Sequence, residues 1–377
     1  MSSVYLHIPF CKQKCHYCNF YSVASQKYRP VFVDALLREL QLRKDYLADK
    51  HVRTIYFGGG TPSLLNPEEI NRILKSIAGF FYVDEKAEIT LEANPDDLSE
   101  DYLKQLKNET PVNRLSIGIQ SFFDDDLHYL HRVHDGRQAR KALETALKTG
   151  FSNLSVDLIY GIPTLTENKW IKNLEQFFHY RIPHLSSYAL TVEPQTALQR
   201  LIDRKQRKNP DEDQSIRHFE LLLEMTKQQG LVQYEISNFA RPGFYSKHNS
   251  AYWLGGHYLG LGPSAHSFNG RSRQWNVSNM KQYIESETSA RIVLEKEILT
   301  EQQRFNEYIL TSLRTSWGCD PEHIKNVFGE KYAEFFHRNI QKYITEKKVV
   351  QNGNSYVLTD TGKLFADGIA ADLFSDD

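Results

Sequence analysis

Short apolar segments alternate with helix-like segments through the first half of the chain, and this alternation restricts the fold more than any other feature. Strands are predicted for the apolar runs at 3–10, 52–60, 87–95, 113–121, 153–161 and 184–193. Helices are predicted between them, where apolar residues recur at helical spacing over 29–47, 66–81, 99–108, 136–150 and 166–180. Successive strand–helix units indicate a parallel α/β sheet, which is either an open doubly wound sheet or a barrel.

The alternation ends after Glu193, and a different organisation follows. One long helix is predicted over 211–230, before a stretch rich in glycine and aromatic residues. Three further helices and a hairpin at "NGNS" have the order of a winged-helix-type domain. Because no dense Lys/Arg recognition helix stands out there, we expect a structural or protein-binding role. The sequence thus divides into three parts, namely 1–195, 196–295 and 296–377.

Charge and hydropathy argue against several classes of protein. Lys and Arg total 46 and Asp and Glu total 47, a balance that does not favour a nucleic-acid binder held by a broad positive field. There is no apolar run of about eighteen residues, so we predict no transmembrane helix and only peripheral contact with a membrane. The first apolar stretch runs directly into cysteines and does not resemble a signal peptide. We therefore expect a cytoplasmic protein in a reducing compartment.

Three of the four cysteines, Cys11, Cys15 and Cys18, stand in "CKQKCHYC" with the spacing C-x3-C-x2-C, whereas Cys319 is remote. Structural zinc takes four protein ligands, so this trio would need a fourth ligand, for which His16 is a candidate. A thioredoxin-like pair needs only two thiols, and a ferredoxin cluster uses four. Three thiolates on a [4Fe–4S] cluster leave one iron open, and a small molecule with an amine and a carboxylate, such as S-adenosylmethionine, can chelate that iron.

The C-x3-C-x2-C loop after the first predicted strand, followed by "GGGTP" after the second, resembles the radical S-adenosylmethionine superfamily over about the first two hundred residues. The resemblance implies a partial (β/α)6 barrel for 1–195. It also implies a [4Fe–4S] cluster on Cys11, Cys15 and Cys18 and a bound S-adenosylmethionine. In such barrels the active face lies where the strands end.

Polar residues stand at the ends of the predicted strands, as a cofactor site at that face requires. The glycine turn lets backbone approach a ligand closely, and a carboxylate such as Glu92 within an apolar strand is costly unless it is paired. Each residue alone fits a solvated or salt-bridged position equally well, and only their grouping favours a site. The motif positions that the resemblance assigns to S-adenosylmethionine are Tyr5, Gly59, Gly60, Thr61, Glu92, Gln120, Arg132 and Asp157.

The phrases "YLHIPFC", "LEANP", "SIGIQSF", "HRVH" and "DLIYGIP" resemble one branch of the superfamily, that of oxygen-independent coproporphyrinogen III oxidase and its relatives. The oxidase carries a further cysteine two residues after the third, where this chain has Phe20. The sequence also reaches its first strand within a few residues, without the N-terminal extension of the oxidase. In both features the chain resembles the heme chaperones of this family.

A second stretch, "KHNSAYWLGG" within 196–295, matches the H-N-x-x-Y-W motif of those chaperones through His248, Asn249, Tyr252 and Trp253. A neutral imidazole ligates heme iron, flanking aromatic rings can pack on the macrocycle, and an asparagine can orient the imidazole through its other nitrogen. The alternative is a surface histidine beside two core aromatic residues. His257 and His266 are the second candidates for the iron ligand.

The resemblance therefore implies a heme chaperone with three cofactors or ligands: the cluster, S-adenosylmethionine and heme. Its partners would be recipient apo-hemoproteins and an electron donor such as a flavodoxin or ferredoxin. No catalytic residue is assigned, since we expect no coproporphyrinogen oxidation. The alternative function is the oxygen-independent coproporphyrinogen III oxidase reaction.

Overall fold

Six parallel strands form the central part of the fold, in the order of the chain. The computed structural model describes residues 2–288 and 294–376. Hydrogen-bonded neighbours follow one another as β1 (Ser2–Ile8), β2 (His51–Gly59), β3 (Tyr82–Ala93), β4 (Arg114–Gln120), β5 (Leu154–Tyr160) and β6 (His184–Ala189). All six predicted strands are confirmed.

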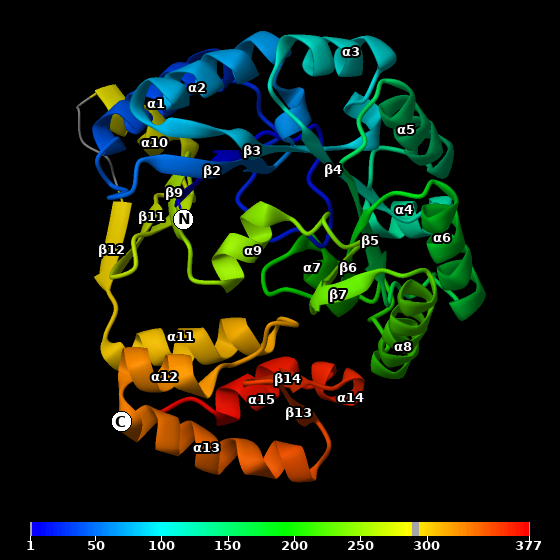
Figure 1. Cartoon of the computed structure of the whole chain (residues 1–377). Helices are drawn as coiled ribbons and strands as arrows, with labels where there is room; N and C mark the ends of the chain where they lie inside the picture. The colour runs from blue at the N-terminus through cyan, green and yellow to red at the C-terminus, as the bar shows by residue number, and fades with distance from the viewer. Residues whose placement is uncertain (1, 289–293, 377) are drawn as a thin grey trace.

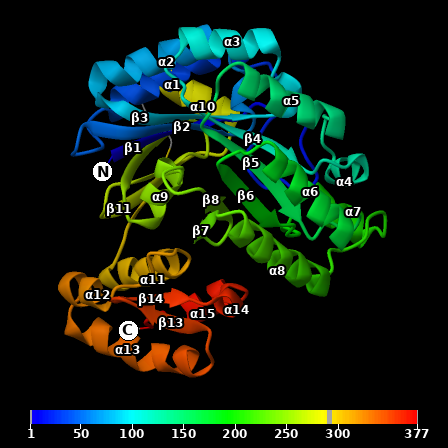
Figure 2. The same cartoon turned by 45° about the vertical axis from the view of Figure 1, so that its right-hand side comes forward.

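The connecting helices cover the outer face of this curved sheet (Figures 1 and 2). They are α1 (Arg29–Arg43), α2 (Pro67–Phe80), α3 (Glu100–Glu109), α5 (Gly136–Lys148) and α6 (Glu167–His179). A doubly wound sheet would carry helices on both faces, so the partial barrel is confirmed over that alternative. The start of α2 follows the sequence closely: Asn66 and Glu69 form a reciprocal capping box with both hydrogen bonds at 2.8 Å.

Later segments extend the same sheet at both edges. At one edge β9 (His257–Leu261) pairs parallel with β1, and β10 (His266–Phe268), β11 (Ser272–Asn276) and β12 (Leu294–Ile298) continue antiparallel. At the other edge β8 (Asn238–Ala240) pairs with β6, and β7 (Val232–Glu235) follows. The long predicted helix is α8 (Glu212–Gln228), and α10 (Met280–Thr288) lies beside α1. The segment 196–295 is thus built into the barrel sheet.

One hydrophobic core runs through both parts, because Leu198, Phe219 and Leu259 are buried in the same cluster as Val4 and Leu6 of β1. The residues of β1 between these apolar ones are Ser3, Tyr5 and His7, which face the interior of the barrel as the two-residue period of a strand requires. The interior is therefore polar, while the layer under the helices is apolar.

The C-terminal part has a separate core around Phe305, Cys319 and Phe336. It comprises α11 (Glu301–Leu313), α12 (Pro321–Phe328), α13 (Glu330–Thr345), the hairpin β13 (Val349–Asn352) and β14 (Ser355–Leu358), α14 (Asp360–Lys363) and α15 (Ala366–Asp372). The last two helices were not predicted. Main-chain bonds join this part to the barrel, since Ile236 N donates to Arg314 O and Ser316 N to Tyr234 O, each at 3.0 Å.

Four short α-helices within the barrel region were also not predicted: α4 (Asp124–Leu130), α7 (Ala197–Asp203), α9 (Lys247–Trp253) and α10. Of these, α9 contains the H-N-x-x-Y-W motif and lies on the inner side of the sheet (Figures 1 and 2). Among the described residues, no helix has the length and apolar character needed to span a bilayer.

Candidate functional site

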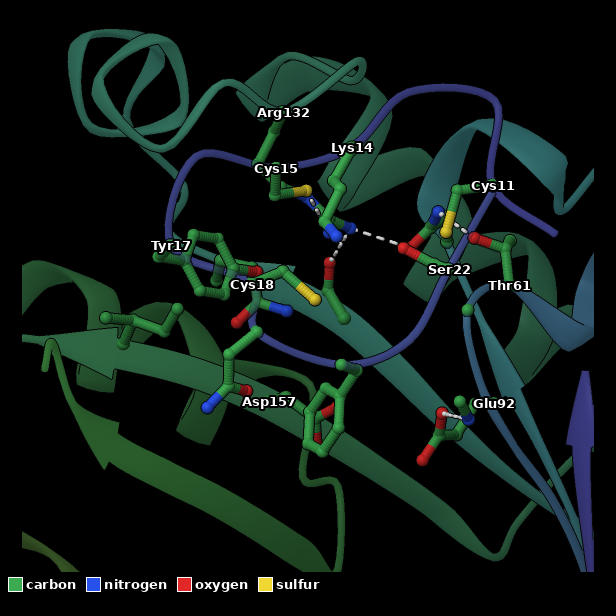
Figure 3. A pocket seen from close by; sticks show the side chains of 18 of the residues that line it. Cys11, Lys14, Cys15, Tyr17, Cys18, Ser22, Thr61, Glu92, Arg132 and Asp157 are labelled. Carbon is green, nitrogen blue, oxygen red and sulfur yellow. Dashed lines mark hydrogen bonds between the residues drawn. The ribbon is translucent and has the colours of Figure 1, made fainter. Parts of the chain in front are cut away.

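The loop after β1 carries the three cysteines around one end of the barrel. Hydrogen bonds from Cys11 N to Val23 O (3.1 Å) and from Val23 N to Pro9 O (2.8 Å) close this loop on itself. His16 N donates to Leu130 O (3.2 Å), which fixes the loop to α4. The loop forms one wall of a cavity of about 450 Å³ that all three cysteines line (Figure 3).

The three thiols line one cavity, as the ligands of one cluster must. Nowhere in residues 2–288 and 294–376 do three His, Cys, Asp or Glu side chains surround a position for a single metal ion. The ring of His16, the candidate fourth ligand of a zinc site, stacks on the ring of His131 with centroids 4.1 Å apart. In a [4Fe–4S] cluster each cysteine binds a different iron, so the sulfurs stand apart. We infer that Cys11, Cys15 and Cys18 are suited to such a cluster.

Positive charge and burial act in opposite directions on these thiols. Burial raises the pKa of the Cys11 thiol and raises that of Cys18 to about 11. The positive charge of Arg132 opposes this effect at Cys11. Arg132 Nη1 donates a hydrogen bond to Cys15 Sγ at 3.4 Å. Its Nη2 donates to Asn94 Oδ1 (2.7 Å) and to Gly118 O (2.9 Å), so the guanidinium is fixed between the cysteine loop and the ends of β3 and β4.

The glycine turn after β2 forms the adjoining wall. Gly59 has a φ of +104°, and a Cβ atom on Gly60 would lie 2.7 Å from Phe10 O, so neither position accepts a side chain without rearrangement. Thr61 Oγ1 accepts a hydrogen bond from Asn94 Nδ2 at 3.1 Å. The turn thus brings bare backbone to the cavity beside the cysteine loop.

Two carboxyl groups lie on the barrel side of the cavity. Glu92 accepts hydrogen bonds from the Tyr56 hydroxyl (2.7 Å) and from Gly59 N (3.2 Å), and burial raises its pKa to about 7. Asp157 accepts from the Ser116 hydroxyl at 3.3 Å, and burial raises its pKa to about 6. Both groups therefore change charge close to neutral pH, which is common among residues that contact ligands.

The cavity brings together all but one of the residues that the sequence assigns to the cluster and S-adenosylmethionine. Gln120, at the end of β4 with a φ of 65°, lines it with the others. Tyr5 does not: it lies beneath, with its hydroxyl 3.1 Å from His7 Nδ1. Sequence reasoning missed Tyr17, Asn94 and Tyr188, which also line the cavity. Only Asn94 carried a signal, because it follows Glu92 in "LEANP" at a strand end.

The heme motif lies in the barrel interior. His248 on α9 is only 1% exposed, its Nδ1 lies 2.7 Å from Thr54 Oγ1, and its Nε2 lies 3.0 Å from the Tyr252 hydroxyl. The expectation that Asn249 orients the ring is wrong, because Thr54 of β2 occupies that position. Burial is the main cause that lowers the pKa of His248 to about 3, so the imidazole is neutral.

The other aromatic groups of this region point elsewhere. Trp253 faces the C-terminal part, where the Arg314 guanidinium lies 5.6 Å from its ring centroid. His257 stands edge-on to Phe268 at 6.1 Å, and the exposed His266 stacks on Trp275 at 5.9 Å. His248 and Tyr252 are thus separated from Trp253 by the helix that carries all three.

Comparisons with known proteins agree with this geometry. The profile of the Radical SAM superfamily matches residues 5–177, and that of the HemN C-terminal domain matches residues 299–365. "Heme chaperone HemW" of Bacillus subtilis is 36% identical over 98% of both chains, and that of Lactococcus lactis is 31% identical over 100% of this chain and 98% of the relative. A mouse mitochondrial "Radical S-adenosyl methionine domain-containing protein 1" is 35% identical over 70% of this chain and 60% of its own.

Among solved structures, coproporphyrinogen III oxidase (HemN) from Escherichia coli superposes with a TM-score of 0.84 at 24% identity, over 99% of this chain and 90% of that chain. This likeness establishes the fold. Superfamily membership implies a [4Fe–4S] cluster and S-adenosylmethionine as cofactors, and the three cysteines and the adjoining cavity fit both. The chain belongs to the radical S-adenosylmethionine superfamily and, within it, to the family of the HemW heme chaperones.

Proposed function

We propose that this protein is a heme chaperone, which binds heme through His248 and delivers it to apo-hemoproteins. The observation that carries the proposal is a buried imidazole, neutral at physiological pH, within the H-N-x-x-Y-W motif. Neutral imidazole is the form that binds heme iron. The names of the full-length relatives support the same function.

Cys11, Cys15 and Cys18 would hold the cluster, and the glycine turn with Glu92 and Asp157 would hold S-adenosylmethionine. A [4Fe–4S] cluster held there would supply the electron for reductive cleavage of the sulfonium of that cofactor. The protein supplies Arg132 beside Cys15, two carboxyl groups for polar groups of the cofactor, and bare backbone at Gly59. Tyr5 would act indirectly, by packing beneath the site.

A titration of cluster-reconstituted protein with ferric heme tests the cargo. Substitution His248→Ala should shift the heme absorption spectrum and weaken binding, because the iron loses its axial ligand. His323→Ala is the control, since His323 is an exposed histidine of the C-terminal part whose ring stacks on Tyr308, and His266→Ala tests the second candidate for the ligand. Transfer to an apo-globin, followed by absorbance, tests delivery. An unaltered spectrum in His248→Ala would place the iron ligand elsewhere.

The second candidate function is oxidation of coproporphyrinogen III, which the overall fold permits. Phe20 argues against it: the ring is 63% exposed at the cavity wall, where the oxidase has its further cysteine. We expect no protoporphyrinogen in an anaerobic assay with S-adenosylmethionine and reductant. Clear turnover would make this second candidate the correct function.

We further propose that an acidic electron donor, such as a flavodoxin, docks beside the cysteine loop. Arg204, Lys205 and Lys208 are exposed after α7, and none of them forms an ion pair in the described parts of the chain. Leu198 N of α7 donates to His16 O at 2.8 Å, so this basic segment adjoins the loop.

Charge reversal tests the docking. The double variant Arg204→Glu and Lys205→Glu should slow cluster reduction by reduced flavodoxin at low ionic strength, but not reduction by dithionite. Lys75→Glu on α2 is the control, since Lys75 is exposed on a remote helix. Equal rates of cluster reduction by flavodoxin in the double variant and the control would exclude this surface as the docking site.

A further inference from the structure

The polar barrel interior behind His248 contains an arginine that forms no ion pair with the described residues. Arg114 begins β4 and is 1% exposed, and among the described residues its Nε has no hydrogen-bond partner. No carboxylate of the described chain lies within ion-pair distance of its guanidinium. Burial of an unpaired charge is unfavourable, so a ligand of opposite charge is expected for such a group.

Strand register places Arg114 at the level of the heme motif. Tyr56 of β2, Thr90 of β3 and Arg114 of β4 are in register and face the interior together. The Tyr56 ring stacks on His248 with centroids 4.8 Å apart. Between Tyr56 and Arg114 lies Thr90, which is 0% exposed and whose Oγ1 also lacks a partner among the described residues. Two unsatisfied polar groups therefore lie side by side, a short distance from the imidazole.

The nearest acidic groups, Glu92 and Asp157, lie within electrostatic range of Arg114, but neither forms an ion pair with it in the described residues. Burial raises the pKa of Glu92 to about 7, so this group is about half protonated at neutral pH, whereas Asp157, with a pKa of about 6, is mostly ionised. Both also line the cavity next to the cysteine loop, whereas Arg114 does not. Ser116 of β4 does line that cavity, so Arg114 lies one inward-facing position deeper in the barrel.

We propose that Arg114 is a carboxylate-binding residue of the cargo site, and that heme ligated by His248 places a propionate group on its guanidinium. This inference rests on the proposed heme function. A guanidinium binds a carboxylate through two parallel hydrogen bonds, and Thr90 lies where its hydroxyl can donate to the same group. Tyr56 then separates the iron ligand from the anion ligand.

The cargo reaches this interior only when α9 moves. In the present arrangement His248 has both ring nitrogens engaged, and Glu88 of β3 accepts from Lys247 N (3.1 Å) and His248 N (3.0 Å) at the start of α9. Gly243 and Gly255, with φ of +88° and +71°, flank the segment and suit a change of backbone direction. Heme binding by His248 therefore requires these contacts to break, and the fraction of molecules in which they are broken scales the apparent heme affinity.

The test compares ferric heme with its dimethyl ester, in which both propionates are blocked. Wild-type protein should bind heme about tenfold or more tightly than the ester, the factor expected for one charged hydrogen-bonded pair. Arg114→Met should bind both ligands with similar affinity. Arg114→Lys retains the charge and should keep part of the preference for heme over the ester. This variant also keeps the test valid if Arg114→Met fails to fold. Arg140→Met, the same substitution on the outer helix α5, should behave as wild type.

Different outcomes would contradict the carboxylate site and the proposed heme function on which it rests. Equal affinity of wild-type protein for heme and ester excludes a carboxylate site. An undiminished preference in Arg114→Met assigns the propionate to another residue. If Arg114→Met binds S-adenosylmethionine more weakly and still prefers heme over the ester, Arg114 binds the carboxylate of that cofactor and not a heme propionate. If instead His248→Ala leaves heme binding unchanged, the proposed function fails first.

Discussion

Protonation of Glu92 should control the affinity for S-adenosylmethionine near neutral pH. The carboxyl group is buried in the cavity wall, and its pKa is raised to about 7, chiefly by that burial. The carboxylate form accepts hydrogen bonds from hydroxyl or ammonium groups of a ligand more strongly than the protonated form does. Because the folded pKa is raised, the binding form is lost as pH falls through 7.

The size of the effect follows from the ionised fraction. A group with a pKa of 7 is about 9% ionised at pH 6 and about 91% ionised at pH 8, so the dissociation constant should rise about tenfold between pH 8 and pH 6. Asp157, with a pKa of about 6, adds about a factor of two over the same range.

Calorimetric titration of anaerobic, cluster-reconstituted protein measures this dependence. Glu92→Gln keeps the shape of the side chain and removes its titration, so the tenfold component should disappear. The amino group of S-adenosylmethionine titrates in both experiments. Its effect therefore cancels when the dissociation constants of the two proteins are compared at the same pH. Asp157→Asn is the matched control, because it should lose only the smaller component. If the ratio of the dissociation constants of wild-type protein and Glu92→Gln stays constant from pH 6 to pH 8, Glu92 does not bind S-adenosylmethionine as a carboxylate.

Three further predictions concern the cysteines and the stability of the barrel. Cys319→Ser should leave iron content and cluster absorbance unchanged, because this thiol is buried in the separate C-terminal core, whereas Cys15→Ser should lose the cluster. Asn66→Ala should lower the free energy of unfolding by about 1 kcal/mol in urea titrations, since it removes the capping box of α2, and no change would deny the cap a role. Trp170→Ala should cost about 3–5 kcal/mol, because this fully buried ring leaves a cavity under α6.

The sequence predicted the strand–helix units well because their signals are local. The two-residue period of β1 and the Asn66–Pro67 start of α2 lie within single segments, and both are found in the structure. The seven-residue helices α4 and α7 escaped prediction because they are too short for helical periodicity to emerge. The sequence motifs also selected residues that the fold gathers around one cavity.

The environment of His248 was beyond sequence reasoning because its partners are distant along the chain. Thr54 is 194 residues away, and Glu88 is 160 residues from His248. Asn249 was the expected partner because it is adjacent in sequence, but adjacent positions on a helix point in different directions. Arg114 gave no signal at all, since an arginine at the start of an apolar strand is expected to be exposed.

The parallel pairing of β1 with both β2 and β9 sets an order on the maturation of the newly made chain. About two hundred residues separate Gly59 from His257, and at about 5–20 residues per second the ribosome needs roughly 10–40 s to make them. During that interval the cysteine loop has already been synthesised, but the strand that precedes it lacks one neighbour. We therefore expect iron and sulfide to be incorporated after translation has passed β9, which exposes the three thiols to oxidants for as long as synthesis of the barrel is incomplete.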